Sequence, residues 1–366
     1  MTKKASIGLV LIALQLALLS GCGGTGAGGN GAETSRWIQQ LKDPAAQKRQ
    51  QAAGALARSG PAAKAAVTPL TEALEDSDDY VRMYAAEALG QIGSEAAAAV
   101  PALVLVMQKD SYGGARSQAA WALGHIGAGA RSAVPALVEA LSEKTLVESA
   151  AGALDKLGEG AAAAQRLTSV VKDKAAPPEK RAAALMGLKK AGDHKAAIAL
   201  MISIVEDKAA VAELRKAATL AVGHMGYDRV EEAKTAVPAL LANLDQKDVL
   251  HSGAWSLWAL GATEPAVARL TELLRHRDPQ VRAAAASGLV HMAGGNAPPE
   301  AKAAVPALIE AFKAKDDART AIVSALGDIG PEAKEALPAL LALLKEDDQW
   351  TRDRVNDAIK KIAPNP

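Results

Sequence analysis

The amino-acid sequence predicts an all-α protein, a right-handed α-solenoid of about ten repeats of two helices each. Three observations predict it. A proline-centred tetrapeptide recurs along the chain, a pattern of alanine, leucine and glycine recurs after it, and aromatic residues make up only 3% of 366 residues. With 49% apolar and 23% charged residues the chain can bury a core. Because aromatic residues are scarce, small and aliphatic side chains must fill that core.

The first helix of a repeat is marked by the tetrapeptide Val-Pro-Ala-Leu or a close variant. Where marked repeats adjoin, the prolines lie 32 or 34 residues apart. Proline suits the first turn of a helix, because the N–H that it lacks has no intrahelical acceptor there. The prolines are Pro69, Pro101, Pro135, Pro238, Pro306 and Pro338.

The second helix carries the pattern of residues 81–93, in which paired alanines precede Leu89-Gly90 and Ile92-Gly93. At 100° per residue the apolar positions share one narrow face, and glycine suits the end of a helix. The pattern is weakest in the first, fourth and fifth repeats. Aligned on it, the second helices end near Gly60, Gly93, Gly127, Gly158, Gly192, Gly226, Gly261, Ala293, Gly330 and Ala363.

Repeats of this length and pattern resemble HEAT repeats, in particular the short type of bacterial phycobilisome-lyase-like HEAT proteins. The resemblance implies that neighbouring units stack, because one unit alone cannot bury its apolar face. It implies an extended concave surface lined by the second helices. The predicted solenoid domain spans residues 35–363, followed by a tail at 364–366.

The N-terminus reads as a targeting segment. Lys3 and Lys4 precede an apolar run at 7–19, which is too short for a comfortable membrane span. The run ends in Leu19-Ser20-Gly21-Cys22, which resembles the lipobox of bacterial lipoproteins. That resemblance implies that residues 1–21 are a lipoprotein signal peptide and that Cys22 is lipidated.

Residues 22–34 then form the lipidated end and a flexible glycine-rich tether. We expect a lipid-anchored, extracytoplasmic protein of the bacterial cell envelope, on the periplasmic side of the outer membrane if the source has two membranes. The alternative is an ordinary signal peptide or an uncleaved anchor with a coincidental cysteine.

One column of the alignment holds arginine in eight of the ten repeats, at the flank of the buried face. A long side chain there can lie on the next repeat and reach its carbonyl or carboxylate groups. We interpret the column as a structural ladder, with Asp78, Asp278 and Asp348 as possible partners. A stripe that binds phosphate or carboxylate ligands is the alternative. The arginines are Arg49, Arg82, Arg116, Arg181, Arg215, Arg282, Arg319 and Arg352.

The sequence contains no HExxH, GxSxG or Walker motif. His125, His224 and His291 share one column but belong to separate repeats, too far apart to hold one metal ion. A net charge of +1 removes the electrostatic case for nucleic-acid binding, and a single cysteine excludes a disulfide within the chain. We expect no catalytic residue, no metal site and no cofactor.

The tryptophans are the best candidates for partner binding. Trp121 and Trp255 share a column opposite the buried face, and Trp258 lies one turn beyond Trp255. On a concave surface these side chains and the neighbouring Tyr84 project into it, and exposed tryptophan is favoured at binding hot spots. The alternative is that helix crossing tucks them between repeats.

These observations favour a non-enzymatic, membrane-anchored scaffold or adaptor that binds protein partners on its concave face. One alternative is a glycan- or peptidoglycan-binding module that uses the same tryptophans as stacking platforms. Another is a chromophore-handling protein of the lyase type, for which this chain has no spare thiol.

Overall fold

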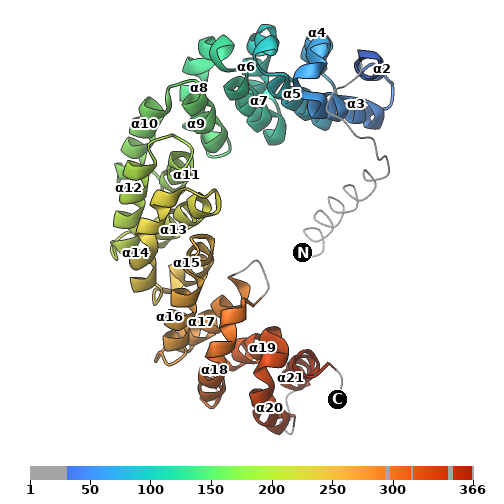
Figure 1. Cartoon of the computed structure of the whole chain (residues 1–366). Coiled ribbons are helices and arrows are strands. Elements are labelled where there is room, and N and C mark those ends of the chain that lie inside the picture. The colour runs from blue at the N-terminus through green and yellow to red at the C-terminus, as the bar shows by residue number, and fades with distance from the viewer. Residues whose placement is uncertain (1–30, 293–296, 315, 345–348, 365–366) are drawn as a thin grey trace.

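The computed structural model describes residues 31–292, 297–314, 316–344 and 349–364. Within that part every regular element is a helix, as the sequence predicts. The helices follow one another along an open arc (Figure 1). Cys22, tether residues 22–30, the helix end expected at Ala293 and Asp348 lie outside the described residues. The last four residues of the predicted tether, 31–34, are helical instead, because they form the first turn of α2 and Thr34 is buried there.

The described residues form ten successive helix pairs, numbered here as units 1 to 10. The first helices are α2 (Gly31–Gln40), α4 (Val67–Ala73), α6 (Val100–Lys109), α8 (Val134–Ala140), α10 (Gly160–Lys172), α12 (His194–Glu206), α14 (Val237–Ala242), α16 (Thr263–Leu273), α18 (Val305–Phe312) and α20 (Leu337–Leu343). The second helices are α3 (Ala46–Ser59), α5 (Asp79–Ile92), α7 (Gly113–Ile126), α9 (Val147–Lys156), α11 (Pro178–Leu188), α13 (Ala212–Tyr227), α15 (Lys247–Ala259), α17 (Pro279–His291), α19 (Arg319–Ile329) and α21 (Gln349–Ile362).

Proline stands in the first turn of the first helices that carry the tetrapeptide, for example Pro101 in α6 and Pro135 in α8. A 3₁₀ segment that the sequence did not predict precedes each of these helices, so the chain enters the unit through a tighter turn. The 3₁₀ segments are η1 (Gly60–Ala66), η2 (Gly93–Ala99), η3 (Gly127–Ala133), η4 (Glu231–Ala236), η5 (Pro299–Ala304) and η6 (Gly330–Ala336).

Most second helices end where the alignment predicts, at a glycine with positive φ that a residue with a Cβ rarely adopts. Gly226 is an exception. It lies inside α13, which continues to Tyr227, and the residue with positive φ after this helix is Arg229, at 62°. The glycines with positive φ are Gly60, Gly93, Gly127, Gly158, Gly192, Gly261 and Gly330.

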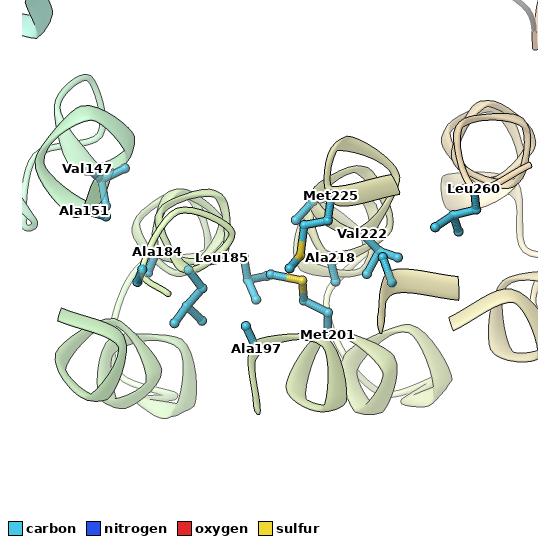
Figure 2. Close-up of a cluster of buried hydrophobic side chains, with 14 of the residues drawn as sticks. Val147, Ala151, Ala184, Leu185, Ala197, Met201, Ala218, Val222, Met225 and Leu260 are labelled. Atoms are coloured by element: carbon cyan, nitrogen blue, oxygen red, sulfur yellow. The ribbon is translucent and has the colours of Figure 1, made fainter. Parts of the chain in front are cut away.

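Small side chains let neighbouring second helices pack closely. A Cβ placed on Gly124 of α7 would lie 2.7 Å from the Cα of Ala153 in α9, and one on Gly327 would lie 2.9 Å from the Cα of Ala358. Leucine, valine and methionine fill the space between the two helix layers. Figure 2 shows this core around α11 and α13, with Met201 and Met225 among its side chains.

The second helices line the inner side of the arc and the first helices its outer side (Figure 1). One stretch of the described residues, Asp79–Lys109, is long and apolar enough by composition to cross a membrane. Gly93 divides this stretch into α5 and η2–α6, and seven residues of α5 are buried against neighbouring units. Its apolar character therefore belongs to the solenoid core.

Candidate functional site

The candidate site is the concave face, the inner surface lined by the second helices (Figure 1). The tryptophans predicted to project into it come from α7 and α15, and Tyr84 comes from α5. All four side chains are half-buried. Each therefore presents only part of its ring to solvent, and the rest packs on the solenoid.

Trp121 lies over the second helix of the preceding unit. A Cβ placed on Gly90 would stand 2.5 Å from Cζ3 of Trp121, so the glycine makes room for the indole. The His125 ring packs against the indole with centroids 3.7 Å apart and planes 31° apart. Nδ1 of His125 lies 2.9 Å from the carbonyl oxygen of Trp121 and donates to it, since a carbonyl only accepts. Trp121 is thus held on two sides.

Trp255 packs over a glycine in the same way four units further on. A Cβ placed on Gly223 of α13 would stand 2.6 Å from Cζ3 of Trp255, and the His224 ring lies 4.9 Å away, tilted by 59°. Trp258 packs against the hydrophobic core. The three tryptophans fall into two places, one on units 2 and 3 and one on units 6 and 7, so they do not form one cluster.

Burial sets the charge of the histidines in both places. It lowers the pKa of His125, against a hydrogen bond to Trp121 that raises it. Burial also lowers the pKa of His224, and the nearby Lys189 ammonium lowers it further. Both imidazoles are therefore neutral at pH 7. Burial also raises the pKa of Glu87, the counterpart of Trp121 in α5.

The sequence analysis missed two exposed aromatic sites. Tyr80 is 49% exposed and packs against Tyr112, with ring centroids 5.5 Å apart. Tyr227 is 65% exposed and begins a four-residue insertion, because Val237 follows Gly226 by eleven residues whereas Val100 follows Gly93 by seven. The lengthened interval between the two motifs is the signal that could have found Tyr227.

The histidines that share a column lie on α7, α13 and α17, as their separate repeats predict. Among the described residues no three His, Cys, Asp or Glu side chains are placed to hold one metal ion. His291 donates from Nδ1 to the carbonyl oxygen of Ser287, 3.0 Å away.

The arginine column runs along the rim where the second helices begin, and most of its members bridge two units. Arg82 binds both carboxylate oxygens of Asp110 in the next unit, at 2.6 and 2.7 Å, and donates to the carbonyl oxygen of Asp76 in its own unit. Arg49 binds Asp76 in the same bidentate way, with both bonds 2.7 Å long. Arg116, Arg215 and Arg282 pair with Glu143, Asp248 and Asp316.

The other column members make different contacts. Arg181 donates to the carbonyl oxygen of Val171, Arg319 lies over the Phe312 ring, and Arg352 donates to Gln349. The expected partners Asp78 and Asp278 do not pair with this column. Asp78 accepts from Gln50 and caps α5, and Asp278 pairs with Lys247. Asp78 and Asp278 each accept hydrogen bonds from backbone N–H groups in the first turn of the helix that follows them. The column arginines pair instead with an acidic residue of the next unit, as Arg82 does with Asp110.

These hydrogen bonds change the acidity of the paired groups. The Arg82 guanidinium lowers the pKa of Asp110, although burial opposes the shift, and Asp110 in turn raises the pKa of Arg82. Burial alone would raise the pKa of Asp76, but hydrogen bonds from Arg49 and from the Asp78 N–H lower it overall. Arg49 and Arg82 are therefore charged, and their guanidinium groups are bound to carboxylates of the solenoid itself.

This architecture, stacked helix pairs with an arginine ladder and an open inner face, defines an α-solenoid of helical repeats. Residues 34–124 and 267–360 match the family model of HEAT repeats, and residues 115–143 match that of the PBS lyase HEAT-like repeat. Together these matches cover more than half of the chain. The protein belongs to the HEAT-repeat family.

Several solved structures are similar to this chain at low identity. An engineered protein is 21% identical with a TM-score of 0.37, over 90% of this chain and 98% of that one. The CpcE–CpcF complex of phycocyanin lyase from Nostoc sp. is 20% identical with a TM-score of 0.40, over 67% and 96%. The karyopherin Kap121p bound to the extreme C-terminus of the protein phosphatase Cdc14p is 14% identical with a TM-score of 0.47, over 99% and 45%. No curated protein sequence matches the chain.

Proposed function

We propose that this HEAT-repeat protein is a non-enzymatic scaffold that binds a protein partner along its concave face. The observation that carries the proposal is the pair of fixed indoles on that face, Trp121 over Gly90 and Trp255 over Gly223. A partly exposed ring that is already immobilised loses little entropy when a partner covers it. Rigid aromatic anchors of this kind dominate protein–protein binding energy.

We further propose that Cys22 is lipidated and that residues 22–30, which precede α2, tether the solenoid to a membrane of the cell envelope. Support comes from the lipobox-like Leu19-Ser20-Gly21-Cys22 and from the glycine-rich stretch after it. Two or more acyl chains hold a protein stably on a bilayer, whereas one holds it only marginally. On this proposal the anchor sets where the concave face meets its partner.

The test is affinity capture of the lipidated protein from gently solubilised membranes of its source, followed by an affinity measurement with the captured protein. Replacing Trp121, Trp255 and Trp258 together by alanine should weaken binding by more than about 2 kcal/mol, which is about thirtyfold. The matched control replaces two exposed leucines on the outer helices, Leu105→Ala and Leu341→Ala, and should bind as the parent does.

Two results would overturn the proposal. One is unchanged affinity in the triple alanine variant with its helical content intact. The other is capture of glycan fragments instead of a stoichiometric protein, read by quenching of tryptophan fluorescence during titration. A Cys22→Ser chain addresses the anchor separately, because it should leave the membrane fraction while still binding the isolated partner.

A further inference from the structure

Second helices pack in one constant register at four junctions between units. Gly90 stands three residues before the helix-ending Gly93 and faces Ala122, which stands five residues before Gly127. The same offset recurs where Gly124 faces Ala153, where Gly223 faces Ser256 and where Gly327 faces Ala358. At each of these four junctions, therefore, the same positions along the two second helices are in contact.

The junction between units 4 and 5 departs from this register. Gly187 of α11 stands five residues before Gly192, the column position that Gly288 holds in α17, where a placed Cβ lies 3.4 Å from Cβ of Ala254, seven residues before Gly261. Gly187 instead faces Val147, with Cγ2 of Val147 2.8 Å from a Cβ placed on Gly187, and Asp155 lies against Gly192. Val147 stands eleven residues before Gly158, so the displacement relative to the α15–α17 junction is four residues along the helix, about 6 Å at 1.5 Å per residue.

The displaced junction also lacks the arginine–carboxylate pair that joins neighbouring units elsewhere in the arginine column. The column position of unit 4 is Val147, which is buried, and in the described structure no arginine of unit 4 reaches an acid of unit 5. One ion pair joins the second helices at another place. Nζ of Lys189 lies 2.7 Å from Oε2 of Glu148, with the lysine side chain 8% exposed and the glutamate 45%.

Two cavities flank this junction on opposite sides. One, of about 230 Å³, lies between the turn Leu141–Lys144 and the start of α11, with Pro177, Glu179, Lys180 and Ala183 in its wall. The other, of about 470 Å³, is lined by Asp155, Gly158, Gly160, Ala161, Gly192 and Asp193. The larger space is a shallow depression open to solvent, whereas the 230 Å³ cavity removes contact atoms from the interface itself, and poorly packed interfaces are among the first to open.

We propose that the junction between units 4 and 5 is a bending joint of the solenoid, closed by the Glu148–Lys189 ion pair. Units 1–4 and units 5–10 form two arms that turn about it and change the curvature of the concave face. The arc in Figure 1 changes direction where α9 meets α11. The helices on either side keep their internal packing, so the motion is a hinge between two preserved bodies.

The test compares distance distributions between pairs of spin labels by double electron–electron resonance. The full chain carries Cys22→Ser, so only introduced cysteines are labelled. Each pair spans two units on exposed positions of the outer helices, and the pair across the joint should give a distribution about twice as wide as the others. The pairs are Gln108→Cys with Gln165→Cys across the joint, Glu72→Cys with Glu139→Cys in the first arm, and Ser203→Cys with Ala268→Cys in the second.

Two substitutions should change the width of the distance distribution measured across the joint in opposite directions. Glu148→Gln removes the ion pair and should widen that distribution. Ala183→Leu adds apolar volume to the 230 Å³ cavity and should narrow it. The distributions within the arms should stay unchanged in both variants. A width across the joint equal to the widths within the arms, and insensitive to Glu148→Gln, would overturn the proposal even if the leucine variant does not fold.

Discussion

Glycines within the second helices decide how closely neighbouring units stack. Gly90, Gly124 and Gly327 lie in the middle of helical turns, where glycine costs about 1 kcal/mol relative to alanine. Each faces the backbone of the next second helix at a distance that leaves no room for a methyl group. The close approach of the helices offsets the lost helix propensity.

Gly124→Ala should therefore destabilise the solenoid by about 1–3 kcal/mol, the usual cost of overpacking a tight contact. The new Cβ would meet Cα of Ala153 at 2.7 Å, and backbone atoms yield little. The matched control on the same helix is Gly113→Ala, where nothing lies within 4 Å of the new Cβ, and its effect should stay within about 0.5 kcal/mol. Urea unfolding midpoints measure both. Equal midpoints for the two variants would contradict the close-packing argument.

The Arg82–Asp110 pair predicts a dependence of stability on pH. Asp110 has a pKa below its ordinary value of 3.8, and its side chain is only 5% exposed. A carboxyl with a lowered folded pKa stabilises the fold above its unfolded pKa, and this is lost as pH falls through the folded value. Asp110→Asn should cost about 1.5–3 kcal/mol at pH 7, the range for hydrogen bonds to charged groups, and much less at pH 2.

The control for this prediction is the exposed pair of Glu310 and Lys313, with both side chains 66% exposed. Glu310→Gln should cost less than about 0.5 kcal/mol at either pH, because solvent screens an exposed pair. Urea denaturation at pH 7 and pH 2 compares the variants. If the Asp110→Asn penalty were the same at both pH values, the ion pair would not be its source.

At the scale of elements, the end of α13 differs from the other helix ends. Arg229 has a positive φ of 62°, whereas the residues with positive φ after seven other helices in the described residues are all glycines. A residue with a Cβ pays for that conformation by about 1–2 kcal/mol. Arg229→Gly should stabilise the protein by about 0.5–1 kcal/mol, since the extra freedom of glycine in the unfolded chain cancels part of the gain.

Thermal unfolding followed by circular dichroism tests this, with Gly93→Ala as the reverse substitution at an equivalent helix end, where φ is 76°. The melting temperature should rise for Arg229→Gly and fall for Gly93→Ala. A lower melting temperature for Arg229→Gly would mean that the arginine side chain makes a contact worth more than the strain.

Most helices were predictable because repeated signals mark them: a proline in the first turn of the six first helices that carry the tetrapeptide, an apolar face, and a glycine after most second helices. The side-chain partners were less predictable, because they depend on how units cross. Asp78 is four residues from Arg82 in sequence, but Arg82 reaches Asp110 across the unit boundary. Trp121 was placed on the outward face of its helix, and whether it lies over Gly90 depends on a crossing geometry that periodicity does not contain.

At the scale of the whole molecule, stability is a sum over units and the interfaces between neighbours. If the interface between units 4 and 5 is the weakest, a destabilising substitution in one arm should increase local unfolding in that arm and not in the other. Leu89 is fully buried in unit 2, so Leu89→Ala should cost about 2–5 kcal/mol locally. Hydrogen exchange should rise in α3, α5 and α7 and stay unchanged from α11 onward.

The mirror experiment uses Leu326→Ala in α19, which should raise exchange in the second arm and leave α5 as it was. Mass spectrometry of peptides from both arms reads the two variants side by side. If exchange rose uniformly along the chain in either variant, the ten units would unfold as one cooperative body and the joint would not divide them.

The ladder also makes the array modular. Unit 3 presents Asp110 to the unit before it and Arg116 to the unit after it, so it carries one half of each junction. Between units 7 and 8 both halves of the pair are absent, since unit 7 has Leu250 in the arginine column and unit 8 has His276 at the position that Asp76 and Asp110 hold in units 2 and 3. A duplicated copy of unit 3 inserted behind the original would meet an arginine on one side and offer one on the other. The chain can therefore gain copies of unit 3 without either flanking junction being redesigned.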